Sequence, residues 1–193
     1  MDVHTLPGSR RPPLAEWLDA PSGWTDLDPV SERLHGLLQQ VPGPVRDALH
    51  GVWLGHPLHP AVVQVPVGCW LSATLLDAAC ASPDAARRLT AIGLAGVAPA
   101  AWTGWADWST LPREQRRTGL LHVVGVVTAA ALQGASLGAR CRAARTGTTP
   151  ATGRRLGLAG LAVLAATATL GAHIAYRSES MAPAPDDDAS DLS

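Results

Sequence analysis

Residues Thr118–Ala139 read TGLLHVVGVVTAAALQGASLGA and contain no Asp, Glu, Lys or Arg. A helix of about 20 apolar residues is long enough to cross the hydrocarbon core of a bilayer. A soluble helix of this length would carry charged side chains every three or four residues along its exposed face. The stretch therefore predicts a membrane-spanning helix rather than a helix of a soluble bundle.

Three further windows lack charged residues in the same way. They are Ala48–Leu76, Leu89–Ala106 and Leu156–Tyr176. Small residues are frequent in these windows, which suits close helix packing inside a membrane. We therefore predict an all-α fold, an integral membrane four-helix bundle within residues 56–177, with spans at about 60–80, 89–108, 118–139 and 156–176.

The remaining charges lie in the predicted loops and tails. Charged residues make up 16% of the chain and the net charge is -1. This balance excludes a nucleic-acid-binding protein that relies on a basic surface. The sequence also has no hydrolase triad pattern, phosphate loop or dinucleotide fingerprint, so we favour a role other than that of an enzyme.

The segments outside the predicted spans differ in character. We expect residues 1–28 to form a disordered or irregular tail, because prolines interrupt them repeatedly. Residues 29–55 should form helices on the membrane surface or against the bundle, since apolar residues recur at helical spacing between Pro29 and Pro42. Residues 178–193 contain the run Asp186–Asp188 and are typical of an acidic disordered tail.

Ionisable residues gather at one end of the four predicted spans. His56 and His59 stand at the start of the first span, and Asp107 stands at the end of the second. His122 lies about one turn inside the third span, and His173 lies one turn before the end of the fourth. Because successive spans alternate in direction, all five side chains should reach one layer, where such groups usually face the bundle interior.

A bound cofactor is the first hypothesis for this layer. Imidazole and carboxylate groups are ligands of zinc, iron and copper, and two facing histidines can hold a haem iron. We therefore expect a metal ion or haem bound by His59, His122 and His173, with His56 and Asp107 as alternate ligands. Such a site would serve electron transfer or sensing.

Two other roles fit the same layer. It would tie helix ends together by hydrogen bonds in a structural or partner-binding subunit, or it would belong to a proton or small-solute pathway. Asp77, Gln64 and Gln133 within the spans motivate the pathway, although such residues often only bond neighbouring helices. Trp105 and Trp108 lie near the layer, where they would form an aromatic belt or stack against a porphyrin or quinone.

The segment Gly55–Pro60 has the sequence GHPLHP. Two prolines flank His59, so the hexapeptide does not form the middle of a regular helix. Pro60 suits the first turn of a helix, where a missing N–H is harmless. We predict a rigid start to the first span, followed by a kink or loosened turns near Pro66.

These motifs resemble a known family. They are Leu54–Pro60 (LGHPLHP), Val65–Gly68 (VPVG), Asp77, Gly104–Trp108 (GWADW), His122 and Gly171–Tyr176 (GAHIAY). The chain from about residue 45 to 177 is similar to the family called domain of unknown function 2231, predicted bacterial four-span membrane proteins. Residues 44–51 (PVRDALHG) resemble its actinobacterial branch, whose members are often fused to a Rieske iron–sulfur domain. No Rieske Cys-X-His pairs occur here, so electron transfer would require a separate redox protein.

The resemblance implies a multi-pass protein in the bacterial inner membrane, with the lipid bilayer as its partner. Four spans place both termini on one side, together with the loop near residue 112. The other two loops carry the larger share of the arginines. By the positive-inside rule those loops are cytoplasmic, which predicts that both termini lie outside.

Overall fold

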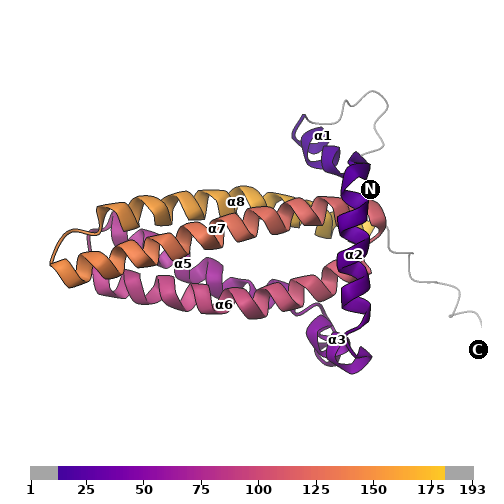
Figure 1. Cartoon of the computed structure of the whole chain (residues 1–193), viewed down its shortest axis with the longest axis horizontal. Helices are drawn as coiled ribbons and strands as arrows, with labels where there is room; N and C mark the ends of the chain where they lie inside the picture. Colours follow the sequence, from indigo (N-terminus) through magenta and orange to yellow (C-terminus); the bar gives the residue numbers. More distant parts are fainter. Residues whose placement is uncertain (1–12, 181–193) are drawn as a thin grey trace, which may run out of the picture.

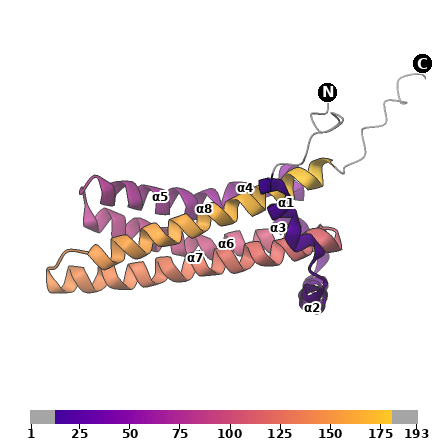
Figure 2. The same cartoon turned by 90° about the horizontal axis from the view of Figure 1, so that it is seen from above.

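The computed structural model describes residues 13–180, and its regular elements there are all helical. Four long helices dominate: α5 (Gln64–Ala78), α6 (Pro83–Thr110), α7 (Arg113–Thr146) and α8 (Ala151–Ser180). They run side by side along the long axis of the molecule (Figures 1 and 2), and α7 packs most extensively on α8 and α5 on α6. The all-α prediction is confirmed.

Three segments of this bundle are long and apolar enough to cross a membrane. They are His59–Ala78, Arg113–Thr146 and Ala151–Ala175. Helix α6 is not among them, although it was expected to carry a span at 89–108. Alanine and glycine fill much of that window, and threonine and tryptophan add little hydropathy, so the most apolar stretch of α6 falls short of those in the other three segments.

The first span is interrupted near its start, as the prolines predict. Helix α4 (His59–Val62) ends before Val63, and α5 begins at Gln64. Pro66 has no N–H to bond the carbonyl of Val62, so the regular helical ladder is broken at this point. The predicted loosening of the first turns is confirmed, and it leaves α4 as a separate turn that carries His59.

The centre of the bundle is apolar. Trp70, Ala129 and Leu164 are buried there together. The indole of Trp70 fits against Gly93 of α6, where an added Cβ would lie only 2.3 Å from its Nε1. Glycine thus permits the close approach of α5 and α6 on which this core depends.

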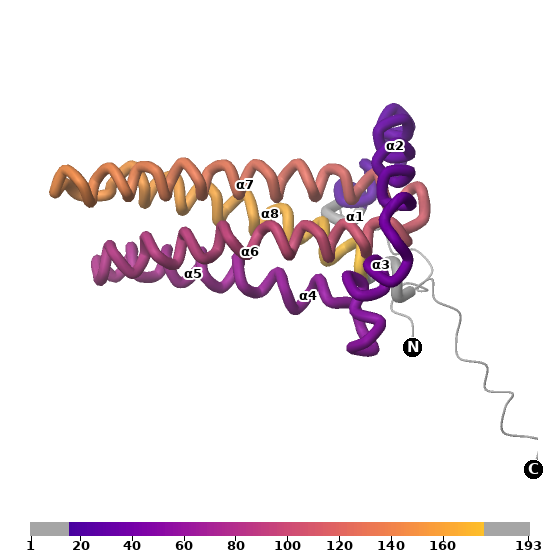
Figure 3. Tube along the Cα trace, turned by 60° about the horizontal axis from the view of Figure 1, so that its bottom comes forward, coloured from indigo at the N-terminus to yellow at the C-terminus, as the bar shows by residue number. Residues whose placement is uncertain are grey.

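Short helices precede the bundle and lie across one of its ends. They are α1 (Pro13–Asp19), η2 (Ala20–Gly23), η3 (Thr25–Leu27), α2 (Asp28–Gln39), α3 (Gly43–His50) and η4 (Val52–Leu54). We call residues 13–54 the collar. Figures 1 and 3 show α2 running across the end of the bundle at which α6 turns into α7.

The collar differs in part from the expectation. Helices at 29–55 are found as α2 and α3, but residues 13–27 are helical where an irregular tail was expected. They are ordered by contacts with the bundle, chiefly between η2 and α7. Residues 178–180 belong to α8 rather than to a tail. The remainder of both expected tails, 1–12 and 181–193, lies outside the described residues.

Candidate functional site

His59 is fixed against helix α6 by a backbone hydrogen bond. Its Nδ1 lies 3.0 Å from the carbonyl oxygen of Ala100 and 3.3 Å from Oγ1 of Thr103. One turn after Ala100 stands Gly104, where an added Cβ would come within 2.8 Å of the imidazole Cε1. Because a carbonyl oxygen only accepts, Nδ1 carries a proton, and in the neutral ring the lone pair is then on Nε2.

His122 repeats this arrangement on the other helix pair. Its Nδ1 lies 3.1 Å from the carbonyl oxygen of Thr167 in α8. Gly171 stands one turn later, and an added Cβ there would lie 3.0 Å from the imidazole Cε1. In both settings a glycine four residues after the accepting carbonyl lets the ring reach the helix backbone. The accepting carbonyl again requires a proton on Nδ1, which in the neutral ring leaves the lone pair on Nε2.

The two rings belong to one layer of the bundle. His59 is held against α6 and His122 against α8, both toward the collar end of the bundle. Within residues 13–180, neither Nε2 has a hydrogen-bond partner. Both rings are half-buried, and we call His59 and His122 the histidine pair; each ring is oriented through Nδ1, and in its neutral form it presents Nε2 as a free electron donor.

The other three predicted site residues are engaged elsewhere. Nε2 of His173 contacts Oδ1 of Asp19 in the collar at 2.7 Å. Oδ1 of Asp107 lies 2.9 Å from Nδ1 of His50. His56 is exposed, and its Nδ1 lies 3.1 Å from the carbonyl oxygen of its neighbour Pro57. Among residues 13–180 no three His, Cys, Asp or Glu side chains converge into a group that could hold a metal ion.

The collar residues that pair with the bundle escaped sequence analysis. The carboxylate of Asp28 receives two hydrogen bonds from Arg117, at 2.7 and 2.8 Å, and Arg117 also donates to the carbonyl of Ser22. Glu32 pairs with Arg113. The hydrogen bonds from Arg117 hold the pKa of Asp28 below its usual value, with a smaller coulombic contribution. No spacing in the sequence marks these partners, because they lie far apart along the chain.

The two tryptophans near the layer have different surroundings. Trp108 is buried, donates from Nε1 to the carbonyl of Arg116 at 2.9 Å, and packs against Gly119. Trp105 lies beside Trp102, with ring centroids 5.6 Å apart. Trp108 therefore fastens the turn between α6 and α7, whereas Trp105 and Trp102 form an aromatic pair.

A second polar region lies at the opposite end of the bundle. Asp77 makes a bidentate ion pair with Arg140, which is 3% exposed, and Nε of Arg154 lies 3.5 Å from the same carboxylate. Gln133 donates to the carbonyl of Gly157 at 3.0 Å. The apolar centre of the bundle separates this region from the histidines.

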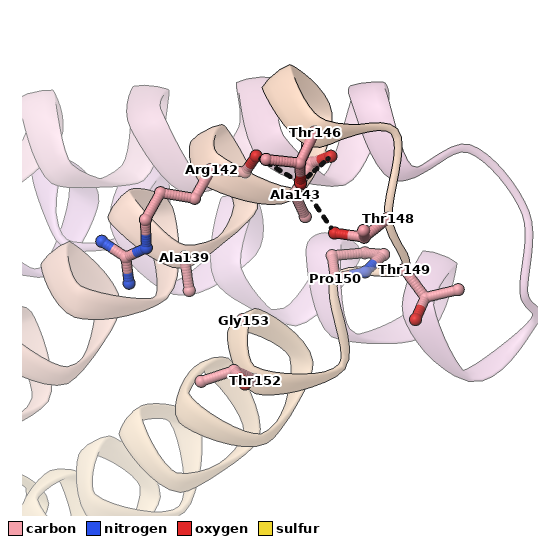
Figure 4. Close-up of a pocket in the computed structure, with 9 residues that line it drawn as sticks. All are labelled: Ala139, Arg142, Ala143, Thr146, Thr148, Thr149, Pro150, Thr152 and Gly153. Carbon is pink, nitrogen blue, oxygen red and sulfur yellow. Dashed lines mark hydrogen bonds between the residues drawn. The ribbon is translucent and has the colours of Figure 1, made fainter.

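Two features near these regions add no group to the site. Gln64 donates to the carbonyl of Pro60 in its own helical segment. A cavity of about 180 Å³ opens at the turn between α7 and α8 and is lined largely by threonines (Figure 4). Arg142, which lines the cavity, lies at the same end of the bundle as Asp77, so the cavity is remote from the histidine pair.

Comparison with known proteins decides the family. A family described as a predicted membrane protein (DUF2231) matches residues 55–181. The chain belongs to the DUF2231 family. The matched region begins with the GHPLHP segment and includes both members of the histidine pair, while the whole collar precedes it. No curated protein and no solved structure matches the chain.

Proposed function

We propose that this member of the DUF2231 family is a four-span protein of the bacterial inner membrane with both termini outside. The spans are α4 with α5, α6, α7 and α8. Support comes from α7, in which the ion-paired residues Arg117 and Arg140 bracket Thr118–Ala139. That stretch rises about 33 Å at 1.5 Å per residue, close to the ~30 Å thickness of a hydrocarbon core.

Within this bundle, we propose that His59 and His122 bind a haem iron or a transition-metal ion through Nε2. The observation that carries the proposal is that both rings are held in the same way, with Nδ1 of each ring bonded to a backbone carbonyl. Metal-binding histidines are usually oriented by such a bond from the second ring nitrogen. Haem iron can be held by histidine side chains, and His59 and His122 would be the residues that hold it here.

A bound haem or redox metal would supply one-electron chemistry, and the chain would serve electron transfer or sensing. The protein's own contribution is to orient both rings and to select the tautomer through the hydrogen bonds of Nδ1. His173 and Asp107 would act on the site only indirectly, since they fasten the collar over this end of the bundle. A separate redox protein would deliver or remove the electron.

A structural role is the second candidate function. It is favoured by the pairing of His173 with Asp19 and of Asp107 with His50. Two of the five expected ligands are thereby engaged in contacts between the collar and the bundle. If the role is structural, the histidine pair only forms hydrogen bonds that join α4 to α6 and α7 to α8. Replacement of His122 by alanine would then lower thermal stability without removing any cofactor.

Titration of the purified full-length chain separates the two candidates. Haemin, and separately Cu²⁺, are added while absorption and thermal stability are recorded. We expect saturable binding that is lost in His59→Ala and His122→Ala but retained in the control His56→Ala, whose ring is exposed. Absence of saturable binding by the wild-type chain would overturn cofactor binding, and a stability loss in His122→Ala would then favour the structural role.

A further inference from the structure

The collar exposes large apolar side chains that its contacts with the bundle leave uncovered. Trp17 is 65% exposed, Trp24 51% and Trp53 70%. Aliphatic residues of the collar are also exposed: Val30, Leu37, Val45, Val52 and Leu54. Soluble surfaces rarely gather so many large apolar groups, and such patches mark contact with a protein or a membrane.

Helix α2 shows how the apolar surface is divided. Ser31 and Leu38 are buried against the bundle, whereas Val30 and Leu37 lie one position earlier and are exposed. Residues seven apart share a helical face, so the exposed pair forms a strip beside the buried pair. The apolar side of α2 is therefore wider than its contact with the bundle.

A small apolar cavity lies where the collar meets the bundle. Trp17 and Trp24 form one side of it, Leu121 of α7 and Leu170 of α8 form the other, and its volume is about 100 Å³. Leu121 follows the ion-paired Arg117 by four residues, which is about 6 Å along the helix. The cavity thus begins one turn inside the charge-free part of α7.

We propose that the collar is a lipid-binding element and that this cavity receives an acyl-chain segment. The rings of Trp17 and Trp24 then lie at the boundary between the headgroups and the acyl chains of one leaflet. This inference rests on the proposed span positions and is independent of cofactor binding by the histidines.

Three properties of the surface fit a lipid partner. Tryptophan prefers the membrane interface because its ring is largely apolar and its N–H is polar. Interfacial helices bury their apolar face about 5–10 Å into this boundary, which agrees with the depth of Leu121. The cavity wall is also continuous with α7 and α8, whose exposed Val127 and Leu158 would face lipid tails in the proposed bundle.

Quenching by brominated phospholipids tests the proposal. The full-length chain is placed in phosphatidylcholine nanodiscs whose acyl chains carry bromine either near the headgroup or near the middle of the bilayer. The tryptophan emission of Trp17 and Trp24 is obtained as the difference between the wild type and the variant Trp17→Phe/Trp24→Phe. Circular dichroism of both proteins verifies that the variant keeps its helices.

We expect the difference signal to be quenched more by the shallow bromine than by the deep one, and to be shielded from aqueous iodide. A difference signal that neither bromine quenches would overturn the proposal. Quenching of this signal by iodide would also overturn it, and so would coverage of the two rings by another protein chain. The variant Val127→Trp, in the middle of α7, is the control for the spans. If deep bromine quenches it while the collar signal stays unquenched, the spans stand and only the collar proposal fails.

Discussion

Gly104 and Gly171 face the rings of the histidine pair, and substitution at Gly104 gives the sharpest quantitative prediction of a change in stability. Replacement of Gly104 by alanine places a Cβ 2.8 Å from Cε1 of His59. The ring can move away only by leaving the carbonyl of Ala100, which removes a hydrogen bond of about 0.5–1.5 kcal/mol. If the ring stays, the overpacking costs about 1–3 kcal/mol.

Gly134→Ala is the matched control, because nothing lies within 4 Å of an added Cβ at that position of α7. Alanine favours a helix over glycine by up to about 1 kcal/mol, and this gain is common to both variants. The difference between their free energies of unfolding should therefore be about 0.5–3 kcal/mol, which covers both responses of the ring, with Gly104→Ala the less stable. Denaturant unfolding of both proteins in the same detergent measures it. Equal stabilities would refute the packing of His59 against α6.

Two further predictions concern ion pairs at opposite ends of the bundle. Asp77→Leu should destabilise the protein by about 3–5 kcal/mol, because it leaves a buried Arg140 unpaired. Arg140→Met should cost less stability, since Arg154 still contacts the carboxylate of Asp77. Comparable losses of thermal stability in the two variants would contradict this order. Arg117 lowers the pKa of Asp28, so the contact between α2 and α7 should hold above the ordinary aspartate pKa and weaken as pH falls through the lowered value. The protection of α2 against hydrogen exchange, corrected for the intrinsic effect of pH on amide exchange, follows this loss, and Asp28→Asn should abolish the pH dependence of that protection.

The helical fold could be read from the sequence because the bilayer sets a simple requirement. A span needs about 20 residues without charge, and the empty windows reveal this directly. Helix α6 is the exception. Its window without charge is long enough for a span, but its small residues and tryptophans give that window a lower hydropathy than the other three have. The break before Gln64 was also foreseeable, because Pro66 has no N–H to bond the carbonyl of Val62. Helix α6 nevertheless accommodates Pro99 without such a break.

The partners within the histidine layer could not be read in the same way. Alternating span direction brings ionisable residues toward one layer, and the structure places His59 and His122 in equivalent settings there. It pairs His173 instead with Asp19, which is 154 residues away in the sequence. Nothing in helical periodicity specifies how a short preceding helix docks on a bundle, so the collar contacts emerge only from tertiary packing.

The absorption spectrum of the chain, purified from cells in mild detergent and recorded oxidised and then reduced, tests the central claim most directly. The account predicts a Soret band or a stoichiometric metal ion, lost in His59→Ala and His122→Ala and unchanged in His56→Ala. A wild-type protein with no haem absorption, and with no bound metal in elemental analysis of the same sample, would contradict ligation by the histidine pair.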